Sequence, residues 1–85
     1  MARDYNVIID LDAVESLPKS GKRREEVIAY LRWLSGAVRI RGDIRFQDEF
    51  SQRTYEVSLI AGFAITWWLD APIESIRVVD IRPSK

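Results

Sequence analysis

Hydrophobic positions in the first half of the chain recur at the spacing of a helix. From about Lys22 to Ser35 the apolar side chains follow a 3.6-residue period, and Ser20 and Gly36 are residue types that begin and end helices. The apolar stripe consists of Val27, Ile28, Leu31 and Leu34, with Tyr30 beside it. The pattern predicts a main helix over residues 22–35 that packs its apolar stripe on a sheet.

From residue 38 the period changes to two. Apolar residues or glycine occupy the even positions from Val38 to Phe46, and polar residues, including Arg39, Arg41 and Arg45, occupy the odd positions that alternate with them. Such alternation predicts a half-buried strand whose apolar side faces the core. The three arginines would then lie together on its exposed face.

Further alternating segments predict the rest of the fold. Residues 53–60, 63–69 and 73–81 have strand patterns, separated by a tight Ala61-Gly62 turn and a break at Pro72. Upstream, residues 5–9 predict a first strand and residues 12–17 a short helix. We therefore expect one α+β domain over residues 1–85: an N-terminal strand, one or two helices, then a four-strand antiparallel meander packed on the main helix.

Two adjacent tryptophans lie within the strand predicted at residues 63–69. Trp67 shares its parity with Phe63, Ile65 and Leu69, so we expect it in the core, while Trp68 must point to the opposite face. An exposed Trp beside arginines has the composition of a binding hot spot. Alternatively, Trp68 is covered by the chain's own tail or by an Arg side chain.

Composition excludes several kinds of chemistry. The chain has 85 residues, 47% hydrophobic and 31% charged, and it contains neither Cys nor His. Disulfide scaffolds, thiol nucleophiles, Cys/His zinc sites and histidine-based acid–base catalysis are therefore excluded, and we expect no metal and no cofactor. The longest nearly apolar run, residues 59–69, is shorter than the roughly 20 residues that a membrane span needs. Without a secretory signal pattern, we expect a cytoplasmic protein with no membrane partner.

Charge is unevenly distributed although the net charge is zero. Residues 19–45 carry eight basic and three acidic side chains, and Arg outnumbers Lys ten to three over the whole chain. Arginines of this kind either pair with acidic residues of the same chain or bind a partner's carboxylates, phosphates or bases. Because nucleic-acid-binding proteins usually carry a basic excess, the neutral total does not favour an RNA, DNA or ribosome partner.

Three segments carry a recognisable order of elements: the opening Tyr5-Asn-Val-Ile-Ile, residues 55–68 with their small turn and following aromatic, and the closing Ile76-Arg-Val-Val-Asp-Ile-Arg82. In this order the chain resembles the RelE/ParE toxin superfamily of bacterial toxin–antitoxin systems. The resemblance implies a toxin-like module that binds an antitoxin. In the RelE branch it also implies mRNA cleavage on the ribosome, which uses basic residues of the meander.

Most of those basic positions are not basic in this chain. Glu56 and Ser58 stand on the third strand and Ala64 follows the turn aromatic, so Arg82 is the single match. We therefore expect a dimeric, toxin-like module that acts by binding an antitoxin-like protein or a second copy of itself rather than by catalysis. The candidate binding residues are Trp68, Arg39, Arg41, Arg45 and Arg82. The alternatives are a small homodimeric structural or interaction protein and a ribosome-dependent endoribonuclease.

Overall fold

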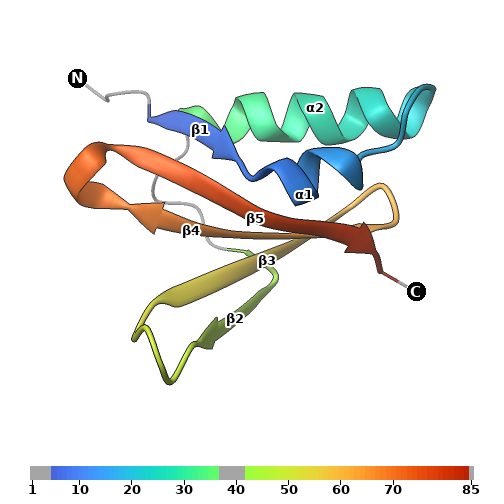
Figure 1. Ribbon diagram of the computed structural model, residues 1–85. Coiled ribbons are helices and arrows are strands. Elements are labelled where there is room, and N and C mark those ends of the chain that lie inside the picture. Colours follow the sequence, from blue (N-terminus) through green and yellow to red (C-terminus); the bar gives the residue numbers. More distant parts are fainter. Residues whose placement is uncertain (1–4, 37–41, 85) are drawn as a thin grey trace.

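A computed structural model describes residues 5–36 and 42–84, in which two helices lie on one face of a five-stranded sheet (Figure 1). The elements in chain order are β1 (Asn6–Ile9), α1 (Leu11–Glu15), α2 (Lys22–Ser35), β2 (Ile44–Gln47), β3 (Thr54–Ile60), β4 (Phe63–Asp70), a 3-10 turn (Ala71–Ile73) and β5 (Ser75–Pro83). The strand order is β1-β5-β4-β3-β2. The predicted α+β class is confirmed.

The meander formed by β2 to β5 is antiparallel throughout. It begins with the pairing of β2 and β3 and ends with that of β4 and β5, as the alternating segments predict. β1 joins the same sheet beside β5, parallel to it, with Asn6 opposite Ser75. A parallel neighbour requires a crossover connection, and the segment that carries the two helices lies within it.

The core lies between α2 and the covered face of the sheet. Helix α2 begins and ends at the predicted residues, and Val27, Leu31 and Leu34 are its buried side chains. Facing them are buried side chains of β4 and β5: Ile65, Trp67, Ile76, Val78 and Ile81. The core role predicted for Trp67 is confirmed, since only 2% of its surface is exposed.

The helix ends differ in part from the prediction. Gly36 follows α2 and donates its N–H to the Trp33 carbonyl, as expected of a C-terminal cap. The N-cap is Gly21 at φ 90°, a left-handed value that favours glycine, and not Ser20. The short helix spans Leu11–Glu15, one residue earlier at its start than predicted and two at its end.

One buried polar cluster ties α2 to the sheet. Ser58 of β3 is 2% exposed, and its Oγ lies 2.6 Å from the Tyr30 hydroxyl and accepts a hydrogen bond from Trp67 Nε1 at 3.0 Å. Burial raises the pKa of Tyr30 above its ordinary value, so the phenol stays protonated at neutral pH. These two contacts satisfy the Ser58 hydroxyl, which would be costly to bury without hydrogen-bond partners.

The face assignment predicted for the second strand is wrong. Arg45 lies opposite Glu56, which lies opposite the buried Trp67, so Arg45 is on the face that carries the helices. Ile44 and Phe46 point to the other face and are about half exposed. The period-two pattern shows that the two faces of β2 differ, but it does not show which face the helices cover. β2 is an edge strand in a hairpin that extends away from both helices (Figure 1). Arg39 and Arg41 lie outside the described residues.

The tryptophans provide a matched test of the core. Trp67→Ala removes a buried ring and the partner of Ser58, so we expect the free energy of unfolding to fall by about 3–5 kcal/mol. Trp33→Ala, at a residue that is 51% exposed, should cost about 1 kcal/mol or less. Urea titrations followed by far-UV circular dichroism measure both changes. Equal losses in the two variants would contradict this core assignment.

Candidate functional site

The sheet has one face that neither helix of the described chain covers, which we term the open face. Register and alternation assign its side chains. They are Ile8 from β1; Arg77, Asp80 and Arg82 from β5; Ala64, Thr66 and Trp68 from β4; Tyr55, Val57 and Leu59 from β3; and Ile44 and Phe46 from β2.

The β2–β3 hairpin gives the open face its apolar half. Phe46 and Tyr55 lie opposite each other and stack with ring centroids 5.2 Å apart at 20°. Ile44 lies opposite Val57 on the same face. Ile44, Phe46 and Leu59 are 53%, 47% and 50% exposed. A contiguous apolar area of this kind is typical of an interaction surface.

Trp68 lies beside this apolar half and is half-buried under arginine. The guanidinium carbon of Arg53 is 4.1 Å from the centre of the Trp68 ring, and that of Arg77 is 6.0 Å away. Trp68 stays partly exposed in this cation–π arrangement, and both guanidiniums remain at the surface. Trp68 does face outward as predicted, but its neighbours are Arg53 and Arg77 rather than Arg45 of the second strand.

The charged half of the open face is balanced. Arg77 lies 3.8 Å from the Asp10 carboxylate, and Arg82 Nε donates a hydrogen bond to Asp80 Oδ2. That hydrogen bond raises the pKa of Arg82 above its already high ordinary value. Two of the arginines are therefore already compensated by carboxylates of the same chain.

Of the predicted binding residues, the three that the structure describes, Trp68, Arg45 and Arg82, do not lie together. Arg82 lies opposite Ala64, four positions along β4 from Trp68, which corresponds to about 13 Å. Arg45 lies on the other face, where its Nε donates to Glu56 Oε2 at 2.7 Å and Glu56 Oε1 accepts the Gly42 N–H at 2.8 Å. The role of Arg45 seen in the fold is to compensate a carboxylate whose side chain is 8% exposed.

Sequence reasoning missed Arg53, Arg77, Tyr55 and the outward direction of Ile44 and Phe46. A signal for part of this set was present. The two-residue turn at Ala61-Gly62 places Ile60 opposite Phe63, and continuing that register places Tyr55 beside Trp68. Counting back from the turn would have found the aromatic neighbour of Trp68.

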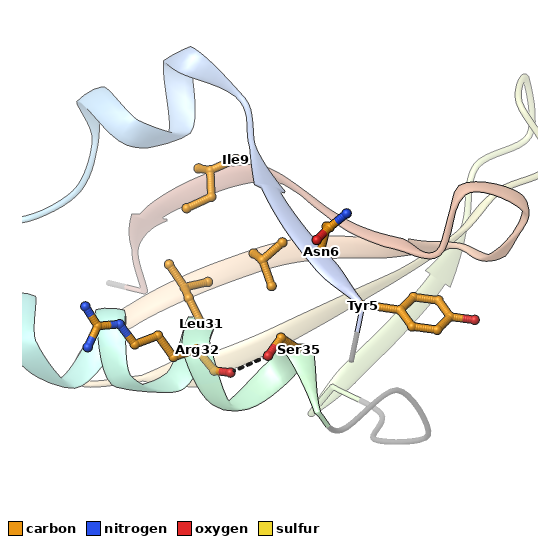
Figure 2. A pocket seen from close by; sticks show the side chains of 7 residues that line it. Tyr5, Asn6, Ile9, Leu31, Arg32 and Ser35 are labelled. Carbon is orange, nitrogen blue, oxygen red and sulfur yellow. Dashed lines mark hydrogen bonds between the residues drawn. The ribbon is translucent and has the colours of Figure 1, made fainter. Parts of the chain in front are cut away.

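A shallow groove of about 450 Å³ runs between β1 and α2 (Figure 2). Its lining consists of Tyr5, Asn6, Val7, Ile9, Leu31, Arg32 and Ser35. Ser35 Oγ donates a hydrogen bond to the Arg32 carbonyl at its rim. Tyr5 and Arg32 are the ionisable side chains among these residues, so the groove contains no acid–base pair and is a weaker candidate than the open face.

Residues 5–36 and 42–84 contain no group of carboxylates placed to hold a metal ion. Neither helix in this part of the chain has the length and hydropathy needed to cross a bilayer. No protein-family model matches the chain, and no protein of curated function matches it.

The contact between Arg45 and Glu56 gives a test of this region. Arg45→Met leaves the Glu56 carboxylate buried without its cation, so we expect a loss of about 1–3 kcal/mol in the free energy of unfolding. Adding Glu56→Gln should recover most of that loss, because a neutral amide still accepts the Gly42 N–H. Arg23→Met, at an exposed residue of α2, is the control and should change stability by about 0.5 kcal/mol or less. Urea unfolding of the four proteins decides it, and a stable Arg45→Met would show that the pair contributes nothing.

Proposed function

We propose that this chain is a protein-binding module, similar in its order of elements to the RelE/ParE toxins, that binds its partner through the open face. The observation that carries the proposal is the orientation of the β2–β3 hairpin. Its apolar residues Ile44, Phe46 and Leu59 are exposed, while the polar Glu56 and Ser58 are buried on the helix side.

This orientation is the reverse of that in a hairpin that serves only its own core. Burying a carboxylate and a hydroxyl requires dedicated hydrogen bonds, and leaving large apolar side chains in water forgoes about 25 cal/mol for each Å² that could be covered. A partner on the open face would remove that apolar surface from water. The stacked Phe46–Tyr55 pair and the Trp68–Arg53 contact supply the aromatic and Arg side chains that dominate binding energy at interfaces.

Charge favours a protein over a nucleic acid as the partner. An RNA- or DNA-binding surface gains affinity from cations that release counterions from phosphates. Here Asp10 and Asp80 already compensate Arg77 and Arg82, and Asp48 interacts electrostatically with Arg53, which forms no direct ion pair with a described carboxylate. A partner with a mixed polar and apolar surface fits this pattern best.

Cross-linking locates the binding face directly. A photoreactive phenylalanine analogue at Phe46 should give covalent adducts with a protein in cells that express the chain, because that side chain lies on the open face. The same analogue at Trp33, which is exposed to a similar extent on α2, should give none. Electrophoresis of irradiated cells reads out both. Adducts of equal yield from the two positions, or from neither, would contradict the proposal.

The ribonuclease alternative has its own test. Arg82 pairs with Asp80, so a phosphate would have to compete with that carboxylate for the guanidinium. We expect the purified chain to leave naked RNA intact, as judged by denaturing gels. Cleavage that is abolished by Arg82→Ala would instead favour the endoribonuclease interpretation.

A further inference from the structure

We infer that the partner on the open face is a second copy of this chain, packed sheet against sheet about a two-fold axis. The inference rests on the proposed function, because it names the occupant of the same surface. It depends on the charge pattern of β5, on the apolar pattern of β2 and β3, and on the size of the face.

The charges of the open face suit a copy of itself. An isologous interface presents the same patch twice, so the patch must carry both signs in places that meet. On β5, Asp80 lies between Arg77 and Arg82 along the strand. Asp10, Asp48 and Asp70 also border the face, so the patch carries the three arginines Arg53, Arg77 and Arg82 and four carboxylates, with both signs in nearly equal number.

Two cross-strand rows set the geometry of the pairing. The first row runs through Asp80, Thr66, Val57 and Ile44, which the strand registers place side by side. The second runs through Arg77 and Trp68 on β5 and β4, and through Tyr55 and Phe46 on β3 and β2. Each row therefore has its charged residue on β5 and its apolar residues toward β2.

Consider a two-fold axis that lies in the plane between the two sheets, perpendicular to the strands and midway between these rows. It places each row of one copy over the other row of the second copy. Asp80 then meets Arg77 of the second copy, and Arg77 meets Asp80 of the second copy. At the other end of the rows, Ile44 meets Phe46 of the second copy. Within these two rows, a single operation matches opposite charges with each other and apolar side chains with each other, and the strands of the two sheets lie close to alignment as in β-sandwiches.

The alternative axis, parallel to the strands, fails on the same pattern. Centred on the sheet, it would place the charged β5 of one copy over β3 of the other, where the apolar side chains Tyr55, Val57 and Leu59 lie. Arg77, Asp80 and Arg82 would then lose water without gaining a partner, which is costly. The charge pattern thus selects one orientation of the second copy.

The size of the face is consistent with a stable dimer. The five strands have between four and nine residues, and a rise of about 3.3 Å per residue with a spacing of about 4.8 Å between strands gives a projected area of about 500 Å². The accessible surface of such a face exceeds its projection. It therefore approaches the roughly 800 Å² per partner of a standard-size interface.

Charge reversal tests both the partner and the axis. In sedimentation equilibrium the chain should have twice the mass of a 9.9 kDa monomer. Asp80→Arg and Arg77→Asp should each weaken dimerisation by about tenfold or more, because each places like charges across the axis. The double variant should recover the affinity to within about threefold. In the double variant the ion pairs inside one chain, Arg77 with Asp10 and Arg82 with Asp80, stay lost. Recovery of the affinity therefore reports the contact between copies.

A charge change away from the face is the control. Arg23→Asp, on the exposed surface of α2, should leave the dimer unchanged. Phe46 and Trp33 are both about half exposed, so replacing either by Cys should have little effect on folding. In this cysteine-free chain, a short bismaleimide should cross-link two copies of Phe46→Cys but not two copies of Trp33→Cys. A double variant that stays monomeric, or equal cross-linking at the two positions, would overturn the inference.

The outcomes also separate this inference from the proposed function. A monomeric wild-type chain whose residue 46 still cross-links to another protein would overturn the second copy and leave the binding face in place. A monomeric chain with no adduct from residue 46 would overturn both. A dimer whose mass depends on residues 77 and 80 supports both.

Discussion

The two-residue turn between β3 and β4 decides which side of the sheet each meander side chain occupies. Ala61 and Gly62 have φ of 53° and 83°, the left-handed values of the hairpin turns that match strand twist. This turn places Ile60 opposite Phe63, and therefore Ser58 opposite Ile65 and Glu56 opposite Trp67. A shift by one residue would exchange the two faces of β3, which would expose Ser58 and bury Leu59. The core, the buried polar contacts and the open face all depend on that register.

Burying Glu56 and Ser58 is possible because α2 and the sheet supply their partners. Tyr30 and Trp67 satisfy Ser58, and Arg45 with the Gly42 N–H satisfies Glu56. Within the described part of the chain, no buried side-chain nitrogen or oxygen lacks a hydrogen-bond partner. Apolar residues at positions 56 and 58 would fill the core equally well. The burial of Glu56 and Ser58 is therefore best explained by its consequence, which is that the apolar side chains of β3 lie on the open face.

Sequence reasoning predicted the elements far better than it predicted the site. The 3.6-residue stripe of α2 and the separation of Trp67 from Trp68 follow from local periodicity, and both agree with the structure. Periodicity does not say which face a partner element covers, so the pattern alone predicts Ile44 and Phe46 inward and Arg45 outward, the reverse of what the structure shows. The Arg53–Trp68 contact depends on the register of two strands, which the composition of either strand alone does not contain.

The parallel pairing of β1 with β5 has a kinetic consequence. Asn6 meets Ser75, 69 positions later in the chain, whereas every other strand pairs with its immediate neighbour in sequence. Closing that long loop costs the most chain entropy of any contact in the sheet, so it is expected to form late, after the local hairpins. On the ribosome, β1 emerges first and finds its partner last. Until β5 emerges, β1 and the apolar side of α2 lack the strand on which the finished core depends.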